Sequence, residues 1–147
     1  MQSNLIKEIM KHTVELSWMK NLAFEGEIDG HKMVLDAAAD AGGDNLGPRP
    51  KKLMLAALAG CTGMDVISIL KKMKVEPESF NVMVEGDVNE EHPKKYTGMK
   101  IIYQFKGKDL PVDKLERAIN LSQDKYCSVS AVYRDAIPIE YEIRIVS

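Results

Sequence analysis

The segment from Leu53 to Leu70 is apolar around nearly its whole circumference when it is wound as a helix. Its length approaches that of a membrane span, but an aspartate near its middle, Asp65, would be costly in lipid. A helix that is apolar on all sides must be covered on all sides. We therefore predict a buried helix of a soluble protein, started by Pro50 and running from about Lys52 to Lys74.

Small residues occupy the middle of this predicted helix, from Ala59 to Gly63. Each glycine there lowers helix propensity by roughly 1 kcal/mol, but a patch of small residues lets another backbone approach closely. A chain of 147 residues can hardly surround such a helix by itself. The sequence therefore predicts a homodimer with this helix at its centre.

The rest of the chain predicts an α+β fold in a single domain spanning residues 1–147. Alternation of apolar and polar residues predicts strands, with Asp29-Gly30 as a tight hairpin turn. Pro111 opens a second helix, and Ser128 is predicted to cap a short third one. The predicted strands cover residues 12–18, 22–28, 31–36, 80–88, 96–105 and 137–146. The order is βββ-α-ββ-α-(α)-β, which predicts antiparallel sheets packed on two main helices.

Charge and the first residues of the chain restrict the function classes. The net charge is −2 and forms no blocks of one sign, which argues against nucleic acid and membrane surfaces as partners. Residues 1–10 are polar and mixed in charge, without the apolar region of a signal peptide. We therefore expect a cytoplasmic protein.

Two cysteines, Cys61 and Cys127, are the residues most able to carry chemistry. In a reducing compartment they do not form a permanent structural disulfide. They are two inert buried thiols, a redox couple, or half of a metal site. Zinc needs about four ligands, and the histidines show no ligand spacing, so we expect no metal site. These histidines are His12, His31 and His92.

Asp65 lies four residues after Cys61 and so on the same face of the predicted helix. A carboxylate close to a thiol raises the pKa of that thiol. We predict that Asp65 bonds a backbone or hydroxyl group within the core of the dimer.

Three segments resemble motifs of the OsmC/Ohr superfamily. The first cysteine motif is matched by residues 47–53 together with 56–66, and the second by residues 125–130. Residues 92–97 are similar to the segment before the second strand pair of that family. The resemblance runs from about residue 10 to the C-terminus, with the elements in the same order.

The resemblance implies an OsmC-like fold in an intertwined homodimer, with the long helices central and two active sites at the subunit interface. It also implies reduction of organic hydroperoxides, with Cys61 as the attacking thiol and Cys127 as the resolving thiol. An external thiol donor, a lipoyl group for some members of the family, then reduces the disulfide. No bound cofactor is implied.

The sequence departs from the family in the charges expected near the attacking thiol. Active members pair an arginine of the N-terminal strand region with a glutamate between Pro and Leu of a Pro-x-x-Leu segment. Here no arginine precedes Arg49, and lysines, Lys51 and Lys52, fill that segment. The chain therefore resembles a branch without the pair, in which Arg49, Lys51 or a lysine of the partner subunit supplies the positive charge. Alternatively, the fold serves as a module for a small hydrophobic or thiol ligand, or as a redox or sulfur-transfer partner.

Overall fold

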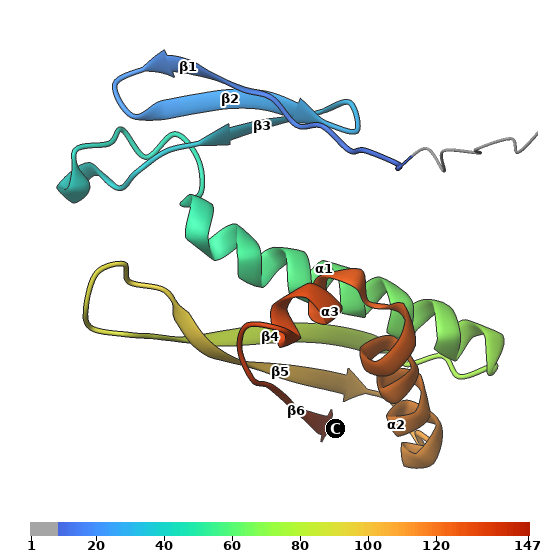
Figure 1. Ribbon diagram of the computed structural model, residues 1–147. Coiled ribbons are helices and arrows are strands. Elements are labelled where there is room, and N and C mark those ends of the chain that lie inside the picture. Colours follow the sequence, from blue (N-terminus) through green and yellow to red (C-terminus); the bar gives the residue numbers. More distant parts are fainter. Residues whose placement is uncertain (1–8) are drawn as a thin grey trace, which may run out of the picture. The chain divides into compact units, whose positions relative to one another are not determined.

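The computed structural model describes residues 9–147, which form two compact units that divide after Pro50 (Figure 1). The first unit is an antiparallel sheet in the order β1 (Leu16–Lys20), β2 (Ala23–Ile28) and β3 (His31–Leu35). Asp29 and Gly30 join β2 to β3 with φ angles of 52° and 79°. Positive φ at both central residues defines the predicted hairpin turn.

A loop after β3 is held by one buried carboxylate, that of Asp36. Its oxygens accept hydrogen bonds from the backbone N–H groups of Ala37, Asp44 and Leu46, at 2.7, 3.0 and 3.1 Å. Desolvation raises the pKa of this carboxyl group, but these hydrogen bonds outweigh it and hold the pKa below its ordinary value. The same loop contains a single 3₁₀ turn, η1 (Ala39–Ala41).

The second unit is built on a long helix and a three-stranded sheet. The helix α1 (Pro50–Lys72) begins at the predicted proline, and the sheet has the order β4 (Ser79–Val88), β5 (Tyr96–Lys106) and β6 (Ile139–Val146). In Figure 1, α1 runs along one face of this sheet. This packing brings the middle of α1 against the central strand β5.

The pairing of the last strand differs from the antiparallel sheet that we predicted. β4 and β5 are antiparallel, but β5 and β6 are parallel, with Met99 opposite Ile139. The chain leaves the end of β5, passes through the helices and returns to the start of β5. Such a crossover connection places two strands in the same direction.

The crossover consists of helix α2 (Val112–Leu121), a single π-helical turn η2 (Ser122–Tyr126) and helix α3 (Ser128–Arg134). Leu115, Ala118 and Ile119 of α2 are buried, as its periodicity predicts. Our prediction that Ser128 caps α3 was wrong, because Cys127 occupies the cap position. The Cys127 sulfur accepts the backbone N–H of Ser130 at 3.4 Å.

The core of the second unit lies between one stripe of α1 and the strand β5. The buried residues of α1 are Leu58, Thr62, Val66 and Leu70, spaced one turn apart. The other sides of α1 are more open, and Met64 is 73% exposed. By length and composition α1 could cross a membrane, a test that core helices of soluble proteins also pass. Within the second unit, residues 51–147, α1 is therefore not covered on all sides.

The α+β class and the order of elements are confirmed by the structure. The predictions of a homodimer and of one domain over residues 1–147 stay predictions.

Candidate active site

The two cysteines come from different elements and meet at one place. Cys61 lies in the middle of α1, and Cys127 lies between η2 and α3. Their sulfur atoms and a carboxylate oxygen of Asp65 all lie within 4.8 Å of one another. Both thiols are free. A disulfide needs an S–S distance of about 2.05 Å, so the sulfurs must approach each other further before the pair can close.

The two thiols differ in their surroundings. Cys127 is buried, with 3% of its surface exposed, whereas Cys61 is half-buried. Burial raises the pKa of the Cys127 thiol to about 11. The N–H of Ser130 lowers this pKa, while the Cys61 side chain and the charge of Asp65 raise it further. Cys127 is therefore a neutral thiol near pH 7.

Cys61 lies on α1, beside the stripe of buried residues that faces the core. Thr62 is buried in the core. Cys61 directly precedes it, and Asp65 lies one turn after Cys61, so Cys61 and Asp65 share a helix face at the edge of the core. The hydroxyl of Ser128 lies 3.9 Å from the Cys61 sulfur and is able to donate a hydrogen bond to it. The Asp65 carboxylate accepts a hydrogen bond from the Ser122 hydroxyl at 3.0 Å. A hydroxyl partner for Asp65 was predicted, and the structure confirms it.

A buried network of polar side chains lies under the cysteines. The Thr62 hydroxyl contacts the hydroxyls of Tyr103 and Ser122 at 2.6 and 2.8 Å. The Gln123 amide donates to both Thr62 and Tyr103, at 3.1 and 3.0 Å. Burial raises the Tyr103 pKa to about 12, so its hydroxyl remains a donor at neutral pH. The network fixes η2, which directly precedes Cys127, against α1, which carries Cys61.

Arg134 closes the network on the side of α3. Its guanidinium donates to the backbone and side-chain oxygens of Gln123, at 3.0 and 2.9 Å, and to the Ser130 hydroxyl at 3.0 Å. Ser130 in turn donates to the Gln123 side-chain oxygen at 2.7 Å. The residues on both sides of Cys127 are therefore tied to each other.

The two predicted cations have other partners. The Lys51 ammonium donates to the backbone oxygen of Lys94 at 3.1 Å and lies 5.8 Å from the centre of the Tyr96 ring. Ten residues of α1 separate Lys51 from Cys61, or about 15 Å along the helix axis. In the first unit, Arg49 donates to the Asn45 side chain at 2.6 Å. The stabilisation of a Cys61 thiolate by either residue stays a prediction.

An apolar hollow of about 280 Å³ is lined by the first turn of α1, the start of β5 and the end of α3 with the residues that flank them. Tyr133 of α3 lines the hollow, and burial raises the pKa of its hydroxyl, with a further contribution from Cys127. The Tyr133 hydroxyl donates to the backbone oxygen of Met54 at 3.0 Å. The remaining lining residues are Lys51, Lys94, Lys95, Tyr96, Ala136 and Ile137. The hollow thus has apolar walls and a rim of lysines.

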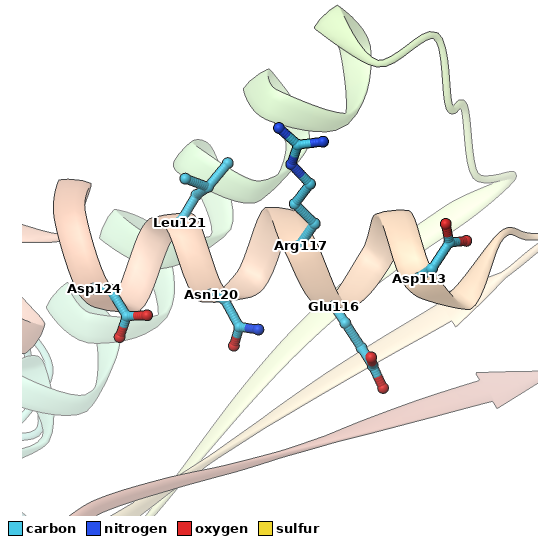
Figure 2. A pocket seen from close by; sticks show the side chains of 6 residues that line it. All are labelled: Asp113, Glu116, Arg117, Asn120, Leu121 and Asp124. Atoms are coloured by element: carbon cyan, nitrogen blue, oxygen red, sulfur yellow. The ribbon is translucent and has the colours of Figure 1, made fainter.

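A second hollow, of about 360 Å³, lies on the outer side of α2 (Figure 2). Glu116, Asn120 and Asp124 follow one another at intervals of about one turn, and their side chains point the same way. Acid, amide and guanidinium groups with no nucleophile or metal-ligand cluster among them are typical of a solvated helix face. Its lining residues are Asp113, Glu116, Arg117, Asn120, Leu121 and Asp124.

Sequence reasoning found the two cysteines and missed most of their partners. Ser128 was assigned to a helix cap and Thr62 to the patch of small residues, while Ser122, Gln123 and Arg134 received no role. Thr62 did carry a signal, because it is polar at a position in phase with Leu58, Val66 and Leu70. A polar residue within a buried stripe needs a buried partner.

Comparison with known proteins agrees with the fold and the motifs. Residues 42–142 match the family described as OsmC-like protein. The chain is 32% identical to Protein YhfA of Escherichia coli K12 over 133 residues, which cover 90% of this chain and 96% of that protein.

Solved structures show the same architecture. A hypothetical protein from Aquifex aeolicus superposes with a TM-score of 0.79 at 28% identity, covering 95% of this chain and all of that one (100%). An organic hydroperoxide resistance protein OsmC from Legionella pneumophila superposes with a TM-score of 0.67 at 17% identity. This superposition covers 94% of this chain and 99% of that one, and at this identity it shows the fold alone.

Proposed function

This chain belongs to the OsmC-like protein family, and on that premise we propose that it is a thiol-dependent peroxidase that reduces organic hydroperoxides. The observation that carries the proposal is the approach of the Cys61 and Cys127 sulfurs to within 4.8 Å from separate elements. Two free thiols at this spacing can exchange between a dithiol and a disulfide.

The difference in exposure assigns the two roles. Cys61 is the more accessible sulfur, and as a thiolate it attacks the outer oxygen of the hydroperoxide. The O–O bond breaks, the alkoxide takes a proton and leaves as an alcohol, and Cys61 becomes a sulfenic acid. The Cys127 sulfur then attacks the Cys61 sulfur, the S–S bond forms, and the hydroxyl group leaves with the thiol proton as water.

The polar groups around the sulfurs support this sequence of steps. A Cys127 pKa of about 11 keeps that thiol protonated until the sulfenic acid forms beside it. The Ser128 hydroxyl, 3.9 Å from the Cys61 sulfur, is a donor for the attacking thiolate. The disulfide returns to two thiols by exchange with an external thiol donor, for which a lipoyl-type dithiol is the expected class.

The apolar hollow lined by Tyr96 and Tyr133 is the expected path for the organic part of the substrate. Its walls suit an alkyl or aryl group, which would gain about 25 cal/mol for each Å² of apolar surface removed from water. A hydroperoxide with an apolar substituent is therefore expected to react faster than hydrogen peroxide.

The exposed side of α1 supports a homodimer. Met64 and Ile67 are 73% and 43% exposed there. They line a groove of about 510 Å³ together with Gly60 and Gly63. Because glycine has no side chain, another helix can approach the α1 backbone closely at these two positions. A second copy of α1 packed on this face would cover it. Because the thiols must return to the reduced state, the cytoplasm is the compartment that fits the activity.

The mass of the intact protein tests the proposal. One equivalent of cumene hydroperoxide, added to the reduced and chelator-treated protein, is expected to remove two hydrogen atoms per chain without adding oxygen. Cys127→Ser should instead gain oxygen on Cys61, and Cys61→Ser should not react. Consumption of hydroperoxide by the unaltered protein at only the rate of free cysteine would contradict the proposal.

A further inference from the structure

Asp65 is poorly explained by peroxidase chemistry. Its carboxylate lies within 4.8 Å of both sulfurs, and a negative charge there disfavours a thiolate. None of the salt bridges found among residues 9–147 involves Asp65. A cation close to the two sulfurs and this carboxylate would favour the charged forms of all three groups, and a metal ion is such a cation.

The three side chains are spaced as metal ligands. Zinc binds thiolate sulfur at about 2.3 Å and carboxylate oxygen at about 2.0–2.2 Å. Tetrahedral angles then place two sulfurs about 3.8 Å apart and a sulfur and an oxygen about 3.6 Å apart. Since the present separations are at most 4.8 Å, a contraction on the order of 1 Å would complete the geometry.

The three ligands are held by rigid elements. Cys61 and Asp65 lie one turn apart on α1, and Cys127 is fixed at the start of α3 by the N–H of Ser130. This pattern of two ligands from one helix and a third from elsewhere leaves a fourth position for water. Cys61 and Asp65 are only half-buried, which gives an ion a path to the site.

Outer contacts orient the ligands as they do in established metal sites. The Ser122 hydroxyl donates to one carboxylate oxygen of Asp65, at 3.0 Å, and is itself held by Thr62 at 2.8 Å. The N–H of Ser130 points at the Cys127 sulfur at 3.4 Å, which is the kind of contact that a metal-bound thiolate accepts.

We propose that the reduced protein binds a zinc ion with Cys61, Asp65 and Cys127 as ligands and water in the fourth position. Two thiolates and one carboxylate favour zinc over magnesium or calcium, which prefer oxygen ligands. The sequence analysis expected no metal site because it looked for histidine ligands and did not combine the cysteines with Asp65.

Zinc binding also regulates the redox pair, and this part of the proposal depends on the proposed peroxidase function. The sulfur lone pairs that bind zinc are those that attack the hydroperoxide and form the disulfide. The zinc-bound and disulfide states therefore exclude each other. Zinc protects both thiols until the ion is removed.

Titration with cobalt tests the site, because thiolate-bound tetrahedral cobalt absorbs in the near ultraviolet and the visible range. The reduced, metal-free protein without oxygen should develop these bands with one equivalent of Co²⁺, and Zn²⁺ should abolish them. Cys61→Ser and Cys127→Ser should each lose the bands. Asp65→Asn should weaken binding at least as much as the roughly 10- to 100-fold loss that follows removal of an outer contact.

Asp124→Asn is the matched control, because Asp124 is an exposed aspartate on the neighbouring turn η2 (Figure 2). It makes the same change of charge and should bind cobalt like the unaltered protein. Circular dichroism of each variant checks that it folds. Equal binding by Asp65→Asn and Asp124→Asn, or no thiolate bands in the unaltered protein, would overturn the three-ligand site.

Measuring hydroperoxide consumption distinguishes the proposed zinc site from the proposed peroxidase function. The zinc-loaded protein should be inactive until a chelator restores it, and equal rates with and without zinc would overturn the regulatory part. If the metal-free protein consumes no hydroperoxide but binds zinc through all three ligands, the peroxidase proposal fails and the metal site stands.

Discussion

At the scale of single residues, Thr62 connects the chemistry to the core. It is fully buried, and its hydroxyl joins three side chains, those of Tyr103, Ser122 and Gln123. Ser122 also holds Asp65. A buried polar group without a partner costs free energy, so the network is stable only as a whole.

Thr62→Val tests this connection. Valine keeps the branched shape and removes the hydroxyl, so the buried partners lose a hydrogen bond. We expect the free energy of unfolding to fall by about 1–3 kcal/mol. Thr97→Val on β5 is the control, because Thr97 is exposed and valine suits a strand. Urea unfolding measures both variants, and equal values would contradict the role of the buried hydroxyl.

At the scale of elements, the sequence predicted what local patterns determine. Pro50 and Pro111 marked the starts of the two main helices, and Asp29-Gly30 marked the hairpin. The parallel β5–β6 pair was missed because alternation within a strand says nothing about the direction of its neighbour. The contacts of Cys127 were missed for a similar reason, since they depend on residues distant in the sequence and on the π turn that precedes it.

The element whose surface remains open is α1, and Met64→Glu tests whether a second copy covers it. Met64 is 73% exposed in the single chain, so the chain itself should tolerate glutamate. A charge buried between two apolar helices would be costly, and we expect a dimer to become a monomer. Light scattering after size-exclusion chromatography measures the mass.

Val112→Glu on α2 is the control for Met64→Glu, because Val112 is also exposed, at 46%. This substitution should leave the mass of the protein in solution unchanged. A monomeric unaltered protein would contradict the homodimer.

At the scale of the whole molecule, the buried thiol of Cys127 and the buried hydroxyl of Tyr103 make the stability depend on pH. The Cys127 pKa is raised from 9.0 to about 11 and the Tyr103 pKa from 10.0 to about 12. A raised pKa means that the folded chain holds its proton where the unfolded chain has lost it. The stability from these groups is therefore present below the unfolded pKa and is lost as pH rises through the folded pKa.

We expect the reduced, metal-free protein to lose stability between pH 9 and 11 through Cys127, and between pH 10 and 12 through Tyr103. Cys127→Ser should remove the first part and keep the second. The urea midpoint at a series of pH values measures this difference, and the shared titration of lysines cancels in the comparison. Parallel pH curves for the two proteins would contradict the assignment to Cys127.

The Cys127 sulfur has two partners, since it lies within 4.8 Å of the Cys61 sulfur and accepts the Ser130 N–H in the first turn of α3. A covalent bond formed by this sulfur competes with the contact that caps α3, the helix that precedes β6 in the chain.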